Sequence, residues 1–349
     1  YQARIAKTRA AMDAAQLDAI FVTDPSNMSW LTGYDGWSFY VHQGVVLTMT
    51  GDPIWWGRAM DAVGAGRTVF MKGGDTIRGY DDTFVQNPDK HPMQELAALL
   101  AEHGLDHARI GVEMDNYYYT AAAHATLTTN LPNATFKDAT GLVNWQRAVK
   151  SSQEIVYMRR AARIVEAMHA RILELVEPGL RKNDLIAEIY ATGMRGADGH
   201  WGDYPAIVPM APSGMDATAP HLTWDGRPMV KGEATFFEIA GAHKRYQCPQ
   251  SRTVFLGNVP LKYQQAEAAV LDAIDAGLEQ ARPGHQAQDI ADAFNAALNK
   301  AGFEKDGRCG YAIGISYPPD WGERTISFRA GDTTVLQAGM TFHFMPALW

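Results

Sequence analysis

The most constraining feature of this 349-residue sequence is a repeat in its second half. Residues 174–190 read ELVEPGLRKNDLIAEIY, and residues 279–295 read EQARPGHQAQDIADAFN. Aligned at one offset, the segments share a Glu, a Pro-Gly pair, an Asp and apolar residues at helical spacing. Pro and Gly stop a helix, and an Asp shortly after them can start the next one. The repeat therefore predicts a duplicated helix-helix unit, with two pseudo-symmetric halves enclosing a cleft.

Strands are expected after each copy of the repeat. A continuous helical pattern starts after Ser151, with Ser152 as the expected N-cap. Before it, helix-like and strand-like segments alternate, which is typical of an α/β domain. The expected domains are residues 1–148 and 149–349. The expected strands of the second domain are 204–209, 234–256, 310–317 and 341–345; the first domain is expected to hold helices at 2–16, 93–103 and 118–130 and strands at 17–24, 43–50, 52–56 and 108–115.

Charge and composition narrow the classes of partner. The formal net charge is −8 and the pI is about 5.8, without a lysine-rich or arginine-rich run, which argues against nucleic acid or an anionic membrane. No window is apolar enough for a membrane span, so a cytoplasmic protein with a small-molecule or protein partner is expected. Cys248 and Cys309 are too few for a disulfide framework or zinc site and are expected to be buried thiols. The apolar end FHFMPALW leads us to expect further residues after Trp349.

A family resemblance appears at residues 147–164, RAVKSSQEIVYMRRAARI. This segment resembles the start of the catalytic domain in the creatinase, prolidase and methionine aminopeptidase superfamily. The resemblance implies an α/β (α+β) protein, with a creatinase-like N-terminal α/β domain and a C-terminal catalytic domain of the pseudo-symmetric pita-bread fold. Residues 211–257 and 311–324 are most similar to the bacterial ectoine hydrolases, a branch of that superfamily.

The resemblance also implies that metal ligands have been replaced. Metal-dependent members hold two divalent ions with two Asp, one His and two Glu. Glu238 and Pro249 stand at the Asp positions, Tyr311 at the His position and Met345 at one Glu position, while the last lies past Trp349. Pro and Met offer no hard oxygen donor, and Tyr would have to lose a proton. We therefore expect no metal and no cofactor, as in creatinase.

A cationic substrate would explain this loss. Ectoine is a cyclic amidine, and its protonated N-C-N unit is already electrophilic, so metal ions would repel it whereas a carboxylate would attract it. The resemblance therefore implies that Glu238 attacks the amidinium carbon or acts as base on a water, with the covalent route favoured. His221, at a catalytic His position of the family, would carry protons. A structural ion pair of Glu238 with Arg252 or Lys244 is the alternative.

Other residues are expected to bind the substrate. Tyr311 would point its hydroxyl into the cleft. Glu323 and Arg324 lie where creatinase uses an Arg for the substrate carboxylate, but their order is reversed, so which of them faces the ligand stays open.

An N-terminal loop is expected to complete the site of a second subunit. Creatinase-like enzymes use a loop of the dimer mate, which implies a homodimer, and the corresponding segment here is TGYDGWSFYVHQ. Trp37, Tyr40 and His42 could stack on a planar cation. Interdomain packing of these aromatic residues is the alternative.

The resemblance thus implies a metal-independent hydrolase that opens the ring of ectoine and 5-hydroxyectoine to N-acetyl-2,4-diaminobutyrate and passes the product to a deacetylase. Three alternatives remain: a creatinase-type guanidinium hydrolase, a prolidase-like metallopeptidase and a non-enzymatic binding module. The sequence leaves open which ring C-N bond breaks.

Overall fold

The computed structural model describes all residues from Tyr1 to Trp349. The chain forms two compact units, Tyr1–Arg147 and Ala148–Trp349, which divide one residue before the expected boundary. None of the helices is both long enough and apolar enough to cross a membrane.

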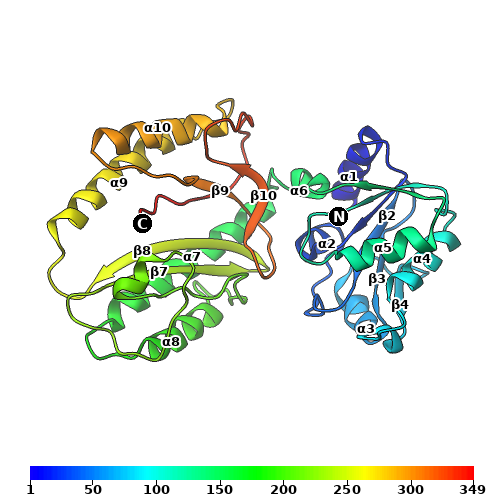
Figure 1. Cartoon of the computed structure of the whole chain (residues 1–349), viewed down its shortest axis with the longest axis horizontal. Helices are drawn as coiled ribbons and strands as arrows, with labels where there is room; N and C mark the ends of the chain where they lie inside the picture. Colours follow the sequence, from blue (N-terminus) through cyan, green and yellow to red (C-terminus); the bar gives the residue numbers. More distant parts are fainter. The chain divides into compact units, whose positions relative to one another are not determined.

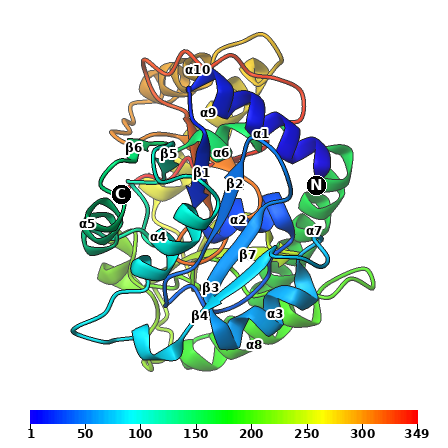
Figure 2. The ribbon, with the colours of Figure 1, turned by 90° about the vertical axis from the view of Figure 1, so that its right-hand side faces the viewer.

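The first unit is built on a six-stranded mixed sheet in the order β4-β3-β2-β1-β5-β6 (Figures 1 and 2). The pairs β1–β2 and β2–β3 are antiparallel, whereas β3–β4, β1–β5 and β5–β6 are parallel. Interleaving helices and strands confirms the expected α/β class. The elements are α1 (Gln2–Ala14), β1 (Ala19–Val22), α2 (Pro25–Thr32), β2 (Gly44–Thr48), β3 (Ile54–Arg58), α3 (Ala59–Thr68), β4 (Ile77–Tyr80), η1 (Asp82–Phe84), α4 (Met93–Glu102), β5 (Arg109–Val112), α5 (Ala121–Asn130), β6 (Thr135–Asp138) and α6 (Leu142–Gln146).

The first half of the second unit packs two helices on a long hairpin. These elements are α7 (Ser152–Leu175), α8 (Lys182–Arg195), η2 (Gly214–Thr218), β7 (Ala234–His243) and β8 (Tyr246–Phe255). The N-cap of α7 is Ser151 and not the expected Ser152, because the Ser151 side chain accepts from the Glu154 N-H while the Glu154 carboxylate accepts from the Ser151 N-H. The expected strand at 204–209 is absent; only Met210 and Ser213 form bridges to β7.

The second half repeats this plan with α9 (Leu261–Gln280), α10 (Ala287–Lys300), β9 (Gly310–Ile313), β10 (Gly322–Ser327) and β11 (Phe342–Phe344). Its strands form a sheet in the order β10-β9-β11. Strand β10 was not expected, since GERTIS carries little apolar alternation. The two halves are joined where Tyr246 bridges Ile315 and the Gln247 N-H donates to the Gly314 carbonyl.

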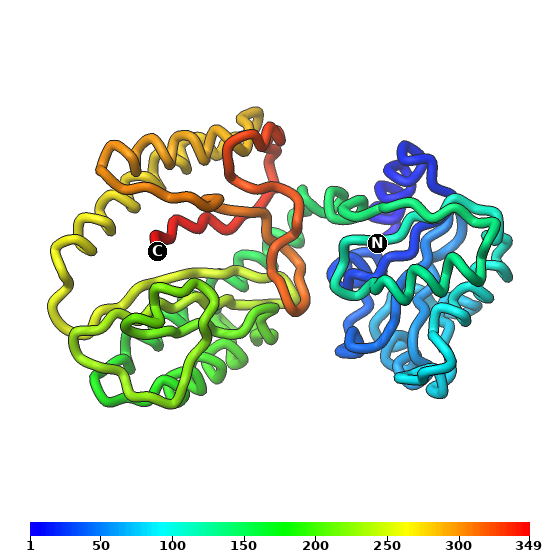
Figure 3. Tube along the Cα trace, viewed as in Figure 1, coloured from blue at the N-terminus to red at the C-terminus, as the bar shows by residue number.

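The structure confirms the predicted repeat: both copies form a helix pair, and equivalent glycines make equivalent hydrogen bonds. Gly179 and Gly284 follow the two prolines, and both have φ of +94°, which favours glycine over residues with a Cβ. The Gly179 N-H donates to the Met229 carbonyl, and the Gly284 N-H donates in the same way to the Leu336 carbonyl. Figure 3 shows the two helix pairs at opposite ends of this unit, with the last residues of the chain between them.

Strand β7 has two different faces because successive side chains alternate. Phe237 and Ile239 belong to the apolar core formed with α7 and α8. Gly241 lies on the same face, where an added Cβ would lie 2.3 Å from the Ala161 carbonyl oxygen of α7, so the strand can approach the helix only without a side chain there. Glu238 therefore lies on the opposite face, away from α7.

Candidate active site

Glu238 is a buried carboxylate without a partner. Its backbone N-H and carbonyl are both hydrogen-bonded to Met210, and the residue is only 6% exposed. No hydrogen bond or ion pair engages the carboxylate, so neither Arg252 nor Lys244 is its ion-pair partner. Burial raises the pKa of Glu238 to about 7. A buried acid without donors is costly to keep ionised, which makes this face of β7 a candidate binding site for a cation.

Ser251 lies beside Glu238 and was not identified from the sequence. The two residues are direct partners in the register of β7 and β8, so their side chains lie on the same face. The Ser251 hydroxyl is buried and also lacks a partner. Lys244 and Arg245 form the hairpin turn between β7 and β8. Locating this turn in the sequence would have predicted that Ser251 pairs with Glu238.

Tyr311 lies on β9, and the charge of Glu238 acts on its phenol. Its hydroxyl accepts a hydrogen bond from Trp321 Nε1 at 2.7 Å and lies 3.2 Å from His343 Nδ1. Burial raises the pKa of Tyr311 above its ordinary value; the hydrogen bond from Trp321 opposes this rise, and the negative charge of Glu238 adds to it. The phenol is therefore a neutral donor. Tyr311 and Glu238 are close enough for the carboxylate charge to act on the phenol, and we treat them as parts of one candidate site. Trp321 and His343 were not predicted from the sequence.

The residues at the four metal positions do not fit a pair of divalent ions. Pro249 has no donor, and Met345 offers only a thioether and is fixed by its backbone N-H to the Cys309 carbonyl. The Tyr311 oxygen already has two hydrogen-bonding neighbours. Nowhere in the chain do three His, Cys, Asp or Glu side chains converge as a metal site requires. Glu238 thus remains as a single hard donor.

His221 is exposed and lies in the segment between η2 and β7. It makes no hydrogen bond or ring contact with Glu238. The connection between them is through the backbone, since the Ala211 N-H donates to the Thr223 carbonyl and the neighbouring Met210 pairs with Glu238. The structure therefore places His221 on an adjoining segment but does not bring its ring to the carboxylate.

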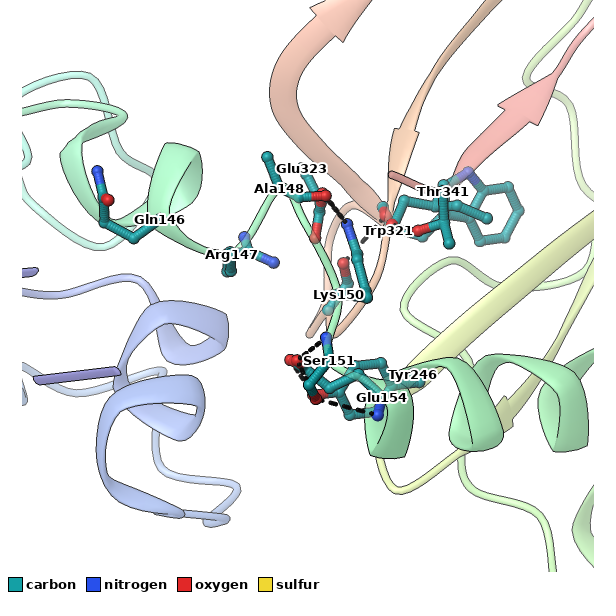
Figure 4. A network of polar contacts seen from close by, with 12 residues as sticks. Gln146, Arg147, Ala148, Lys150, Ser151, Glu154, Tyr246, Trp321, Glu323 and Thr341 are labelled. Atoms are coloured by element: carbon teal, nitrogen blue, oxygen red, sulfur yellow. Dashed lines mark hydrogen bonds and ion pairs between the residues drawn. The ribbon is translucent and has the colours of Figure 1, made fainter. Parts of the chain in front are cut away.

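Glu323 and Arg324 separate into a buried and an exposed residue. Glu323 Oε2 lies 2.5 Å from Lys150 Nζ, and both side chains are 1% exposed (Figure 4). Arg324 is exposed and has a φ of +55°. Lys150 also donates to the Ala148 carbonyl at 3.1 Å. Glu323 therefore acts as the counterion of Lys150, which the sequence did not reveal because the two residues lie far apart in the chain.

In the first unit, the loop that carries Trp37, Tyr40 and His42 is held together by hydrogen bonds of Tyr34. The Tyr34 hydroxyl contacts Ser38 Oγ and donates to Gln43 Oε1. Trp37 is 57% exposed and Tyr40 is 71% exposed.

His42 instead packs within the first unit. Its ring lies 4.7 Å from that of His91, and burial, followed by the charge of His91, lowers the pKa of His42 to about 4. The loop thus presents two aromatic residues outward, while the imidazole of His42 is engaged inside.

A hollow of about 370 Å³ opens between α7 and β8. It lies on the α7 side of the hairpin, whereas Glu238 lies on the other face. The hollow is therefore separate from the candidate site. It is lined by Glu166, His169, Ala170, Ile172, Leu173, Gln250, Arg252, Thr253 and Val254.

Family models match nearly the whole chain. The model of metallopeptidase family M24 matches residues 156–349, and that of the creatinase/prolidase N-terminal domain matches residues 4–149. The chain belongs to metallopeptidase family M24. Within this family it is 56% identical to an ectoine hydrolase of Halomonas elongata, an alignment that covers 100% of this chain and 89% of that protein. It is 40% identical to an uncharacterized hydrolase/peptidase of Sinorhizobium fredii, with coverage of 100% and 89%.

Solved structures of prolidases share the fold. A prolidase from Thermococcus sibiricus superposes with a TM-score of 0.83 at 18% identity, covering 98% of this chain and 88% of that one. This similarity confirms the predicted combination of a creatinase-like N-terminal domain with a pita-bread domain. At such low identity it concerns the fold alone.

Proposed function

We propose that this M24 protein is a hydrolase that opens the cyclic amidine ring of ectoine to N-acetyl-2,4-diaminobutyrate. The observation that carries the proposal is Glu238, a buried carboxylate without a partner at a position where M24 metallopeptidases bind metal. Full-length similarity to an ectoine hydrolase supports the same substrate. The proposed reaction is independent of metal, because the residues around Glu238 are a poor donor set for divalent ions.

The charge of the ligand completes this site. An amidinium 4 Å from the carboxylate would contribute about 4 kcal/mol of attraction at an effective dielectric of 20. That attraction stabilises the anionic form of Glu238, so a bound cation should lower the pKa from its value of about 7 in the empty site. Binding and ionisation therefore favour each other, and affinity should rise with pH below pH 7.

Glu238 can then act in two ways. Its oxygen can bond to the central amidinium carbon while the electrons of the C=N bond move to a ring nitrogen, and water later displaces the carboxylate. Alternatively, it can take a proton from a water whose oxygen attacks the same carbon. In either route the bond between the central carbon and one ring nitrogen breaks, and its electron pair stays on that nitrogen. Both protons of the water also end there, giving an amide and an ammonium group. The covalent route is our proposal. His221 would serve as the proton carrier only if the segment between η2 and β7 moves its exposed ring to the bound ligand.

Further residues are proposed to bind the substrate and to form the dimer. Arg324 would hold the ring carboxylate, since Glu323 is engaged with Lys150. A homodimer in which Trp37 and Tyr40 reach the site of the partner is proposed from their exposure and from the creatinase-like N-terminal domain. A deacetylase would consume the product. We also propose that the enzyme hydrolyses 5-hydroxyectoine and that it works in the cytoplasm.

The test is mass spectrometry of products after incubation with ectoine, 5-hydroxyectoine, creatine and an Xaa-Pro dipeptide in parallel, with and without EDTA. We expect a ring-opened product from ectoine that EDTA does not reduce. Glu238→Gln should abolish it, whereas Glu267→Gln, at an exposed position on α9, should not. Turnover of creatine or the dipeptide instead, or full activity of Glu238→Gln, would refute the proposal.

A further inference from the structure

His343 is a buried histidine that no motif singled out. It lies on β11, directly opposite Tyr311 of β9 in the antiparallel register. Its side chain is surrounded by the rings of Tyr311, at 5.4 Å and 81°, and Trp321, at 6.5 Å and 78°. The reaction proposed above assigns it no role. The Tyr311 hydroxyl is the one side-chain group at hydrogen-bond distance from His343, so any role of His343 in the reaction would act through that hydroxyl.

The hydrogen-bond donors and acceptors around the Tyr311 oxygen allow His343 to set the direction of the Tyr311 O-H. Trp321 Nε1 can only donate, so it occupies a lone pair of the Tyr311 oxygen at 2.7 Å. His343 Nδ1, at 3.2 Å, either donates to the same oxygen or accepts its proton, depending on the imidazole tautomer. When Nδ1 carries the proton, the Tyr311 O-H is free to point elsewhere. When Nδ1 is bare, it takes up the Tyr311 O-H.

The charges around the pair keep both groups neutral. Burial, followed by the positive charge of Arg308, lowers the pKa of His343 to about 4. The Arg308 guanidinium lies 4.3 Å from the centroid of the Tyr311 ring. Glu238 and Asp320 are the negative groups that face Tyr311, and both raise its pKa. The pair is therefore a neutral phenol beside a neutral imidazole, which can orient a hydrogen bond without changing charge.

We infer that His343 is a positioning residue: by donating from Nδ1 it leaves the Tyr311 O-H free to donate to a ring nitrogen of the ligand attacked at Glu238. The inference rests on the proposed function. The amidinium nitrogens have no free lone pair in the ground state. A lone pair appears on one of them when the C=N electrons move during attack. Tyr311 can therefore stabilise the transition state more than the bound substrate, which raises kcat with little effect on KM.

A double-mutant cycle on ectoine hydrolysis tests this inference. Tyr311→Phe should lower kcat about 100-fold and change KM only a few-fold, as expected for loss of one transition-state donor. His343→Leu should lower kcat about 10-fold, and His343→Asn, whose amide N-H can lie near the place of Nδ1-H, should recover part of that loss. Because His343 acts through Tyr311, the double variant should be no slower than Tyr311→Phe alone.

The matched control is His169→Leu. His169 is also buried in this unit, but its Nε2 faces the Gln250 carbonyl on the α7 side of β8, away from Glu238. This variant should lower thermal stability without changing kcat. If His343→Leu does not fold, His343→Asn and His343→Gln decide the test, since the longer Gln cannot place its amide where Nδ1 lies and should be the slower of the two.

Three results would overturn the inference. Losses in kcat that multiply in the double variant would show that His343 acts independently of Tyr311. An unchanged kcat in His343→Leu would show that it does not act at all. A rise in KM as large as the fall in kcat, in both Tyr311→Phe and His343→Leu, would show that the two residues act in ground-state binding. If the wild-type enzyme turns over ectoine, each of these refutes the inference alone, whereas no turnover by the wild type would refute the proposed function and the inference with it.

Discussion

Replacing Glu238 with glutamine should remove a pH-dependent loss of stability. Burial raises the pKa of Glu238 from 4.5 to about 7, so the unfolded chain releases this proton at lower pH than the folded chain does. The contribution of the group to stability is fully present below about pH 4.5 and is lost as the pH rises through about 7. At about 1.4 kcal/mol per pKa unit, the loss is about 3 kcal/mol. That is a large part of the 5–15 kcal/mol of a typical domain.

The assay is urea unfolding of the wild type and Glu238→Gln from pH 4 to pH 8, taking the difference in free energy of unfolding at each pH. Glutamine does not titrate, so its own cost of burial is constant and cancels from the change in this difference with pH. The variant should gain about 3 kcal/mol relative to the wild type across the range. The control Glu267→Gln, at an exposed position, should give a constant difference.

A difference for Glu238→Gln that stays constant within about 0.5 kcal/mol, the usual range for surface substitutions, would refute the reasoning. It would mean that Glu238 is solvated or paired in the folded protein. The proposed attraction of a cation by a poorly solvated carboxylate would then lose its basis. Gain of stability together with loss of ectoine turnover would instead identify a site whose function is maintained at a cost in stability.

Lys150→Met should lower the free energy of unfolding by about 3–5 kcal/mol in urea, because it removes the cation that lies 2.5 Å from the buried carboxylate of Glu323. The double variant with Glu323→Leu should lose less, and an equal or greater loss would contradict the buried pair. Gly241→Ala should cost about 1–3 kcal/mol in the same assay, since its Cβ would lie 2.3 Å from a carbonyl oxygen of α7; unchanged stability would argue against that close approach. Replacing Trp37 and Tyr40 with alanine should leave the melting temperature nearly unchanged, because they are 57% and 71% exposed. The same change should lower ectoine turnover by at least about tenfold if the loop aligns the substrate, and full turnover would exclude that role.

Local patterns were sufficient for the elements that depend on local physics. The Pro-Gly breaks predicted the ends of α7 and α9 and the starts of α8 and α10, because a proline removes a helix donor and a glycine tolerates the positive φ found at Gly179 and Gly284. The N-cap of α7 was assigned one residue late, since two adjacent serines are equivalent until the Glu154 carboxylate selects Ser151. Strand β10 was missed because its residues alternate weakly between apolar and polar.

The site was only partly readable from the sequence. Glu238 and Tyr311 were predicted as site residues from their positions in motifs, and the burial that raises the pKa of Glu238 agrees with its apolar neighbours in FFEIAG. Ser251 was not found, because only strand register places it beside Glu238. His343 was not found either, because the pairing of β9 with β11 joins it to Tyr311 across about thirty residues of chain.

The sequence by itself determined the duplicated helix pairs, the division into two units and the presence of a carboxylate in the apolar strand FFEIAG, since each follows from residues close together in the chain. Only the tertiary structure decided the partners of the buried polar groups. Lys150 and Glu323 lie 173 residues apart and still form one ion pair. A buried charge or hydroxyl must be matched by whichever group the fold brings within hydrogen-bond distance, and that distance depends on how strands and helices pack rather than on the order of residues.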